Sequence, residues 1–399
     1  MFNIGDVINN QYILLDIIGE GNFSTVWLAY DIKKIKIYSL KFINDDDIKG
    51  IGENETYILK YIKKKIPSVE KYKKNLLLYD NILNNLNHII IVENFQNLTL
   101  RDLLSNYELT KNDKNVLLNK MNDIENTIKL LIKYKILHTD IKPENIFIEI
   151  INNEYYNLNE NLINCIKKLT EYGNNTKINK QNKLKHYNLI INDYIKRLKE
   201  ICDKNNKKYL EDSDEEESET STEDENIMTD SDIHSDFNIQ ENIDDYLNNI
   251  IIDNFNNTEN TEDNKKSLDF DLNNIKLSIG DFGNAINYNN NDEYEQLITS
   301  KYHDMQTRYY RDPNLIIRNN DIFTTDLYAY RMIIEEIKKD KIIINPHKNN
   351  QYTTDHEHLR KLINNKNNIK FLNNYKIKGR KLDIFFDYDK ILNGYFLKK

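Results

Sequence analysis

Short apolar runs with strand-like patterning dominate the first hundred residues. Three of them, YILLDIIG, TVWLAYDI and KIYSLKFI, fall between 11 and 45 and are separated by turn-forming residues, so they predict β-strands. Residues 53–65 (ENETYILKYIKKK) instead repeat apolar pairs one helical turn apart and predict a helix. The run HIIIVENF at 88–95 predicts another buried strand. A small sheet that carries one helix therefore comes first in the chain.

The pattern changes after this sheet. From about 98 to 137 the apolar spacing is helical, and after 300 it is largely helical again. The stretch 151–270 between them is polar and of low complexity, and its part at about 204–268 is too polar to bury a core. Its first part holds one amphipathic stripe, made of Tyr187, Ile191, Tyr194, Ile195 and Leu198. We therefore predict that 151–270 is a spacer inserted into one domain, partly helical and then acidic and disordered.

Composition narrows the class of protein. A chain of 399 residues can form one large domain or two small ones with a buried core. It contains 64 Asn but only three Ala, 10 Gly and 4 Pro, a bias that indicates an AT-rich genome of a large DNA virus or a protist. The two cysteines, Cys165 and Cys202, predict neither a disulfide framework nor a zinc site. No apolar run is long enough to cross a bilayer and no secretory signal is recognisable, so we expect an intracellular, cytoplasmic protein without a membrane partner.

The net charge of −9 comes from one tract. Residues 211–225 (EDSDEEESETSTEDE) hold ten acidic and no basic side chains, and subtracting these ten charges from −9 leaves +1 for the rest. No clustered basic patch stands out either. Charge therefore gives no reason to expect direct binding of nucleic acid.

A glycine-rich turn at 19–26 (GEGNFSTV) lies between two predicted strands. Glycines at its first and third positions let backbone N–H groups approach phosphate oxygens, and Val26 can cap an adenine ring. Gly-x-Gly also occurs in ordinary hairpins, so the motif alone leaves both interpretations open. The candidate nucleotide-binding residues of this turn are Gly19, Glu20, Gly21, Asn22, Ser24 and Val26.

Lys41 lies in the middle of a strand pattern, where a lysine must point out of the core or be paired. Glu55, on the predicted helix, can reach Lys41 and hold it against the α- and β-phosphates of a nucleotide. A surface lysine beside a solvated helix face would give the same pattern. Glu93, in the run at 88–95, completes the candidate cofactor-binding residues.

The segment HTDIKPEN at 138–145 is more specific. It places a carboxylate, a cation and an amide on one tight loop: Asp140 can accept a hydroxyl proton, Lys142 can neutralise a transferred phosphoryl group, and Asn145 can bind a metal ion. Asp281 in IGDFG supplies a second metal-binding carboxylate. The order of glycine-rich turn, Lys41, Glu55, this loop, DFG and the run TRYYRDP at 307–313 matches the eukaryotic protein-kinase motif set.

Within that set the chain resembles the SR-protein kinases, which phosphorylate serines in arginine/serine-rich segments. The motifs that carry the resemblance are GNFSTVWLAYD at 21–31 (GHFSTVWLCWD in the family), HTDIKPENI at 138–146, GDFGNA at 280–285 (ADLGNA in the family), QTRYYR at 306–311 and YTTDHEHL at 352–359. The resemblance covers about 11–150 and 275–360. The family also carries a long spacer before its DFG-type motif.

The resemblance implies an α+β, bilobal protein-kinase fold. The N-lobe would occupy 1–97, the first part of the C-lobe 98–150, the spacer 151–270, and a shortened second part of the C-lobe 271–399. It also implies ATP and Mg²⁺ as cofactors, a basic, arginine/serine-rich protein substrate, and the activity of a protein serine/threonine kinase (EC 2.7.11.1 type) in a monomeric chain. Thr139 replaces the arginine that senses a phosphorylated activation segment in many kinases, which implies constitutive activity.

Some features depart from the family. Asn314 stands where a glutamate would form a buried ion pair, NYNNNDEYEQ at 287–296 lengthens the activation segment, and only about 40 residues follow 352–359. These departures leave open a pseudokinase scaffold that binds nucleotide or partners without transfer. Serines and threonines within 211–225 also leave open an acid-directed substrate preference. Asp355 and Glu357 are candidates for docking an arginine-rich substrate, or ordinary surface carboxylates.

Overall fold

The computed structural model describes most of the chain. The described residues are 2–21, 24–44, 50–85, 88–175, 180–214, 265–288, 305–316, 322–346, 354–365, 370–371, 376–377 and 380–381. Asn22 and most of the acidic tract and of the 287–296 run lie outside them. The chain divides into two compact units: unit 1 comprises 1–20, 26–38 and 158–264, and unit 2 comprises 21–25, 39–157 and 265–399.

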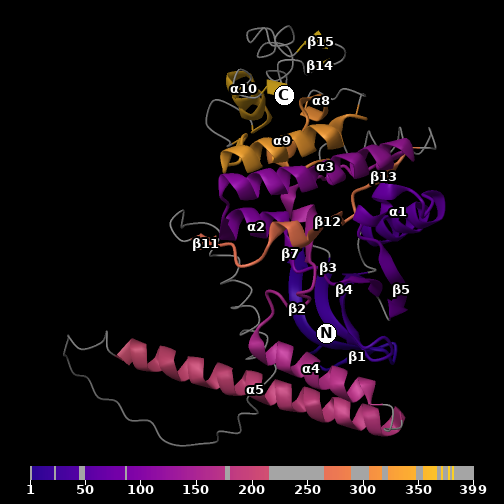
Figure 1. Cartoon of the computed structure of the whole chain (residues 1–399), viewed down its shortest axis with the longest axis vertical. Coiled ribbons are helices and arrows are strands. Elements are labelled where there is room, and N and C mark those ends of the chain that lie inside the picture. The colour runs from indigo at the N-terminus through magenta and orange to yellow at the C-terminus, as the bar shows by residue number, and fades with distance from the viewer. Residues whose placement is uncertain are drawn as a thin grey trace, which may run out of the picture. The chain divides into compact units, whose positions relative to one another are not determined.

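Unit 1 is built on the strands predicted at the start of the chain. They lie side by side in the order β1 (Val7–Ile8), β2 (Tyr12–Gly21), β3 (Ser24–Asp31) and β4 (Lys36–Asn44) (Figure 1). Most of their apolar side chains are buried, although Val7 and Ile18 are exposed, and the rings of Tyr12 and Tyr38 meet edge to face with centroids 6.1 Å apart. The three strands expected between 11 and 45 are confirmed.

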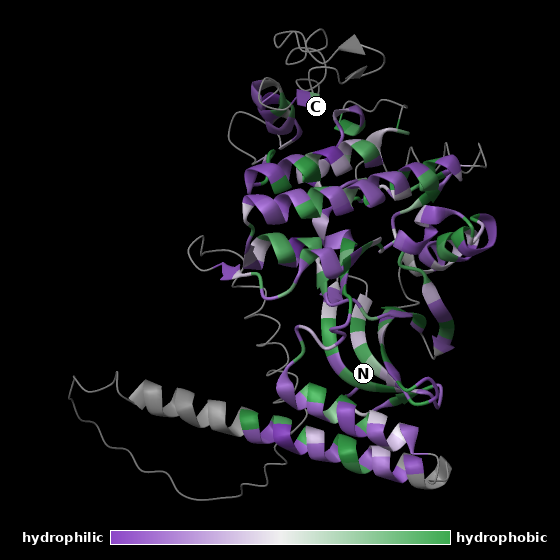
Figure 2. Cartoon of the chain, in the orientation of Figure 1, coloured by the Kyte–Doolittle hydropathy of each residue, from purple (hydrophilic) through white to green (hydrophobic). Residues whose placement is uncertain are grey.

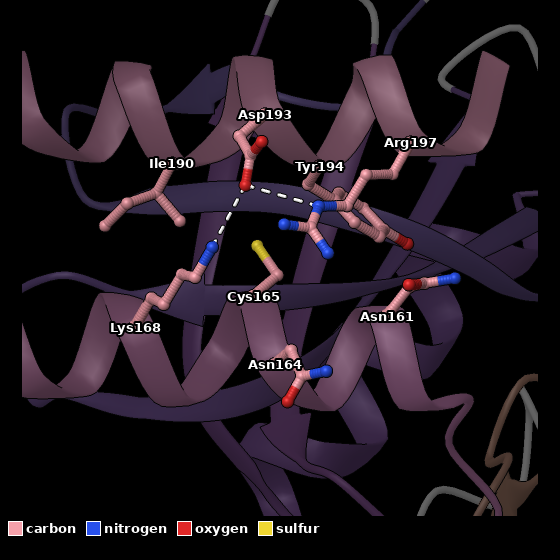
Figure 3. Close-up of a pocket in the computed structure, with 8 residues that line it drawn as sticks. All are labelled: Asn161, Asn164, Cys165, Lys168, Ile190, Asp193, Tyr194 and Arg197. Atoms are coloured by element: carbon pink, nitrogen blue, oxygen red, sulfur yellow. Dashed lines mark hydrogen bonds and ion pairs between the residues drawn. The ribbon is translucent and has the colours of Figure 1, made fainter. Parts of the chain in front are cut away.

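Two helices from the 151–270 stretch belong to the same unit. They are α4 (Glu160–Asn174), which the apolar pattern did not predict, and α5 (Lys180–Asp214), which confirms and extends the predicted amphipathic helix. Asn159 starts α4, because its side chain accepts a hydrogen bond from the Leu162 N–H. Between the helices the Asp193 carboxylate lies 3.0 Å from Lys168 Nζ and 3.4 Å from Arg197 Nε (Figure 3).

The apolar stripes of these helices pack within unit 1. Figure 2 shows hydrophobic residues along β2 and β3 and along both helices. The Tyr30 and Tyr187 rings meet with centroids 6.2 Å apart, and a Cβ at Gly173 would lie 3.0 Å from the Tyr187 hydroxyl. Gly5 has a φ of +93°, and a Cβ there would lie 2.8 Å from an Ile191 methyl. The stripe seen in the sequence is therefore part of a core.

After residues 21–25, unit 2 continues with the remainder of β4 from residue 39, and β6 (His88–Asn94) and β5 (Tyr79–Asn85) follow β4 across the sheet. The two strands are antiparallel, with Ile82 opposite Ile91. Helix α1 (Ile51–Lys65) buries Ile58, Leu59 and Ile62. Strand β6 and helix α1 confirm the sequence prediction, whereas β5, in the Asn-rich run NILNNL, was not predicted.

The rest of unit 2 is mainly helical, as predicted. Thr99 and Thr110 cap helices α2 (Leu100–Asn106) and α3 (Lys111–Lys133), each with an aspartate three residues later in a capping box. The later helices are α8 (Pro313–Ile316), α9 (Thr325–Lys339) and α10 (Thr354–Asn365). The 3-10 helices are η1 (Lys71–Asn75), η2 (Pro143–Asn145), η3 (Leu272–Asn274) and η4 (Arg308–Tyr310). The short strands are β7 (Leu98–Thr99), β8 (Tyr107–Glu108), β9 (Ile136–Leu137), β10 (Ile146–Ile150), β11 (Lys266–Ser267), β12 (Ile275–Ile279), β13 (Ile286–Asn287), β14 (Lys376–Ile377) and β15 (Arg380–Lys381).

The core of unit 2 joins α3 and α9, with Leu117, Met121 and Ile124 of α3 and Ile333 of α9 all fully buried. Packing of these apolar side chains is what holds the helices in place, since burial of each large one stabilises by about 1.5–3 kcal/mol. In the part of the chain that the structure describes, no helix is long and apolar enough to span a membrane.

Candidate active site

Two antiparallel ladders bring distant motifs of unit 2 together. Strand β10 pairs with β12 so that Ile146 lies opposite Ile279, and β9 pairs with β13 so that Leu137 lies opposite Ile286. The loops 138–145 and 280–285 therefore run between the same two ladders, and the Gly280 N–H donates to the Asn145 carbonyl at 3.1 Å. This pairing places the candidate catalytic loop beside the DFG motif.

Gly280 is required by close packing at this junction. A Cβ built on it would lie 2.8 Å from the ring of Phe147 and 3.0 Å from a methyl of Leu77. Contacts under 3.0 Å force neighbouring atoms to shift, so any larger residue at 280 would displace the Phe147 ring.

Lys41, Glu55 and Asp281 form a compact charged triangle. Lys41 Nζ lies 2.9 Å from Glu55 Oε2 and 2.8 Å from Asp281 Oδ1. Burial lowers the pKa of Lys41, but the two carboxylates outweigh it, so the net shift is upward. The Lys41 ammonium in turn lowers the pKa of Asp281 to about 2. Lys41 and Asp281 are therefore both charged at neutral pH, as a site for phosphate and metal requires.

Asp140 is held by donors from three directions. Lys142 Nζ lies 2.9 Å from its Oδ2, and Asn145 Nδ2 donates to its backbone carbonyl at 2.9 Å. The Thr307 N–H and Oγ1 donate to its Oδ1 at 3.1 and 2.9 Å. The carboxylate has a fixed orientation and is only 11% exposed, which suits a group that orients a hydroxyl and accepts its proton. Thr307 lies in the TRYYRDP motif, but its role was not predicted.

The backbone of the loop is fixed by Asp326, a buried residue of α9 with no predicted role. Its carboxylate accepts the His138 and Thr139 N–H groups at 2.6 and 2.9 Å. His138 Nδ1 accepts from the Asp140 N–H, so Nε2 carries the ring proton and donates to the Gly280 carbonyl at 2.9 Å. These hydrogen bonds together hold the loop in a conformation in which Thr139 has a φ of 63°.

Thr139 also connects the loop to the residues after DFG. Its hydroxyl donates to the Asn284 carbonyl at 2.7 Å, and its own carbonyl accepts the Gln306 N–H at 2.8 Å. The Gln306 side chain continues this link, because it donates to the Thr325 carbonyl and accepts the Asp312 N–H, both at 2.8 Å. The described part of the segment that follows the DFG motif is therefore held by these neutral hydrogen bonds together with the charge-assisted contacts of Thr307 with Asp140.

Arg101 of α2 forms a network that the sequence did not reveal. It donates to Glu144 Oε1 at 3.0 Å and to Glu336 Oε1 at 2.8 Å, and it also donates to the Tyr310 hydroxyl. Tyr310 in turn donates to Glu336 Oε2 at 2.6 Å. One guanidinium thus joins the 138–145 loop, the TRYYRDP motif and α9. Asn314, where a glutamate was expected, is buried in α8, and its N–H donates to Asp312 at 2.7 Å.

The other predicted residues are placed as follows. Glu93 follows Val92 in β6 and is close enough to Lys41, Glu55 and Asp281 to interact electrostatically with all three. The candidate residues of the glycine-rich turn lie where β2 ends and β3 begins: Gly19, Glu20 and Gly21 end β2, and Ser24 and Val26 belong to the start of β3. Asn22 lies outside the described residues.

Glu93 gives a pH-dependent prediction. Burial, reinforced by the Glu55 carboxylate, raises its pKa from 4.5 to about 8. Between these values the folded chain binds a proton that the unfolded chain has released, so stability should fall as pH rises from about 4.5 to 8. Glu93→Gln should flatten this decline in thermal unfolding measured from pH 5 to 8.5. Parallel curves for the two proteins would show that Glu93 does not titrate in this range.

The oxygen donors present fit a hard divalent cation. Asn145 uses its Nδ2 to bind Asp140, which leaves its amide oxygen for a metal, and Asp281 is an ionised, 41% exposed carboxylate. Such a pair suits Mg²⁺ held jointly by protein and phosphate oxygens. Among the described residues, no group of three or more His, Cys, Asp or Glu side chains could hold a metal alone.

The two proposed docking carboxylates differ in availability. Glu357 is buried, and its oxygens accept hydrogen bonds from Arg360 at 2.6 and 2.7 Å. Asp355 is partly exposed and lies 3.7 Å from an Arg308 nitrogen. Glu357 is therefore engaged within its own helix, and Asp355 is the one that faces the activation segment.

Known proteins similar to this chain share one domain. A family model described as "Protein kinase domain" matches residues 12–196. SRSF protein kinase 3 of Homo sapiens is 30% identical over 153 residues, which are 36% of this chain and 26% of that protein. Serine/threonine-protein kinase spk-1 of Caenorhabditis briggsae is 28% identical over 161 residues, or 38% of this chain and 14% of that protein. The matched region thus spans about a quarter or less of these relatives.

A solved structure shows the same fold. The crystal structure of the PF14_0431 kinase domain aligns with a TM-score of 0.51 and covers 90% of this chain and 71% of that one. Its sequence identity of 15% makes the likeness one of fold alone.

Proposed function

We propose that this chain, which matches a protein kinase domain model over residues 12–196 and resembles the SR-protein kinases, is an active serine/threonine kinase. Its substrates are serines in arginine/serine-rich or otherwise basic protein segments. The observation that carries the proposal is the joint geometry of two groups: the Lys41–Glu55–Asp281 triangle, and Asp140 held between Lys142 and Thr307.

Each group has a distinct task in the proposed reaction. Asp140 orients the substrate hydroxyl and takes its proton through the carboxylate, while Lys142 offsets negative charge beside it. Lys41, fixed by Glu55, binds the phosphates of ATP, and Asn145 and Asp281 would hold Mg²⁺. A Mg²⁺ ion held by these two residues would supply positive charge that offsets the negative charge developing during transfer.

Constitutive activity is the second part of the proposal. Thr139 takes the place of a phosphate-sensing arginine, and it reaches Asn284 and Gln306 through neutral hydrogen bonds. These bonds need no added phosphate to form. The proposal includes an intracellular location, because the chain would encounter arginine/serine-rich protein substrates inside the cell.

Phosphate transfer to peptides tests the proposal. The purified full chain with Mg-ATP should label an arginine/serine repeat peptide with at least tenfold higher kcat/KM than a peptide whose serines are flanked by acids. Nucleotide binding is followed separately by thermal shift. Stabilisation by Mg-ATP without labelling of either peptide would favour the pseudokinase scaffold, and preference for the acidic peptide would overturn the substrate class.

A further inference from the structure

Asn54 lies on α1 directly before Glu55 and is not part of the charged triangle. Its Nδ2 donates to the carbonyl of Gly283 at 2.9 Å and to that of Ala285 at 3.0 Å. An asparagine amide has two N–H groups, and this geometry uses both of them. A single side chain of α1 therefore binds the backbone on either side of Asn284.

Neighbouring groups extend this link. The Glu55 carboxylate accepts a hydrogen bond from the backbone N–H of Phe282. From the other side, the Thr139 hydroxyl donates to the Asn284 carbonyl at 2.7 Å. The backbone from 282 to 285 is thus held by α1 on one side and by the catalytic loop on the other.

Both partners of Asn54 carry members of the charged triangle. Helix α1 carries Glu55, and the segment 283–285 follows Asp281, which has a φ of 60°. A non-glycine residue in this conformation persists only where surrounding contacts fix it. If α1 and this segment separated, Lys41 would lose its fixed position between the two carboxylates.

We propose that Asn54 is a positioning residue, which fastens α1 to residues 283–285 so that the triangle assembles before nucleotide binds. The inference rests on the proposed kinase function. Two hydrogen bonds of typical net strength correspond to about a 30-fold shift between assembled and separated states. Because Mg-ATP would bind the assembled state better, the loss should appear mainly in KM for ATP and less in kcat.

The test compares three variants of the full chain. Asn54→Asp keeps the side-chain shape but removes both donors, and Asn54→Ala removes them without adding charge. Lys60→Ala, at an exposed position of the same helix, is the matched control. For each protein, KM and kcat for ATP are measured together with amide hydrogen exchange, without nucleotide and with saturating Mg-ATP.

Both Asn54 variants should raise KM for ATP by up to about 30-fold. Without nucleotide, exchange should rise in 51–57 and 280–288 but not in α3, and Mg-ATP should reverse the rise. Unchanged exchange in the two segments overturns the proposal, and so does an equal rise in α3, which would indicate only a general loss of stability. If the unaltered chain transfers no phosphate, the kinase proposal fails, while exchange still decides the role of Asn54.

Discussion

Asp140→Asn is expected to lower kcat for phosphate transfer by about 100- to 10,000-fold, the usual contribution of a general base. Asparagine keeps an oxygen that can accept from Thr307, so the loop should retain its conformation. The other carboxylate oxygen becomes an NH₂ group beside Lys142 Nζ and can no longer take a proton. Transfer is measured with radiolabelled ATP, and nucleotide affinity by thermal shift.

A matched control for this change is Asp193→Asn, the same chemical change on a partly exposed carboxylate of α5 that pairs with Lys168 and Arg197. It should leave kcat within about twofold, since exposed ion pairs contribute little. The assignment of Asp140 as the base is wrong if its variant keeps full activity, whereas loss of nucleotide binding together with transfer would indicate a disrupted loop.

Arg101→Met is expected to destabilise the chain by about 3 kcal/mol, because it leaves the buried Glu336 carboxylate without its cation. Tyr310 can still donate to that carboxylate, but a hydrogen bond from a neutral donor does not replace the lost positive charge. Equilibrium unfolding in urea measures the change through the midpoint at constant slope. Transfer activity should fall as well, since Tyr310 belongs to the end of the activation segment.

Two further variants separate charge from packing in this network. Adding Glu336→Gln to Arg101→Met removes the unpaired charge and should recover about half of the lost stability. Lys129→Met, which breaks an exposed pair with Glu125 on α3, should change stability by less than about 0.5 kcal/mol. An Arg101 variant as stable as the unaltered chain would mean that the network does not contribute to folding.

The candidate site could be predicted largely because its motifs are short and ordered along the chain. Asp140, Lys142 and Asn145 lie within six residues, so their proximity follows from local geometry alone. Asp326 and Arg101 could not be found in this way. Their partners are up to 235 residues away, and only the pairing of strands and helices brings them together. A buried charged residue whose partner is so far away in the sequence produces no local sequence pattern.

The fold was predicted where apolar spacing is strong and missed where asparagine dilutes it. Helix α4 has enough apolar residues to bury Leu162, Ile166 and Leu169, but Asn and Lys fill the positions between them. Strand β5 (YDNILNN) has too few apolar side chains to show a period of two, and its pairing with β6 decides its conformation. In both cases tertiary packing supplied what local preference lacked.

The close approach of Gly280 to Phe147 makes the two positions depend on each other. The SR-protein kinases that this chain resembles have ADLGNA where it has GDFGNA, so they carry a methyl group at the position of Gly280. In this chain that methyl would collide with the Phe147 ring. The two side chains therefore share one volume, so Gly280→Ala requires the Phe147 ring to shift or to be replaced by a smaller side chain.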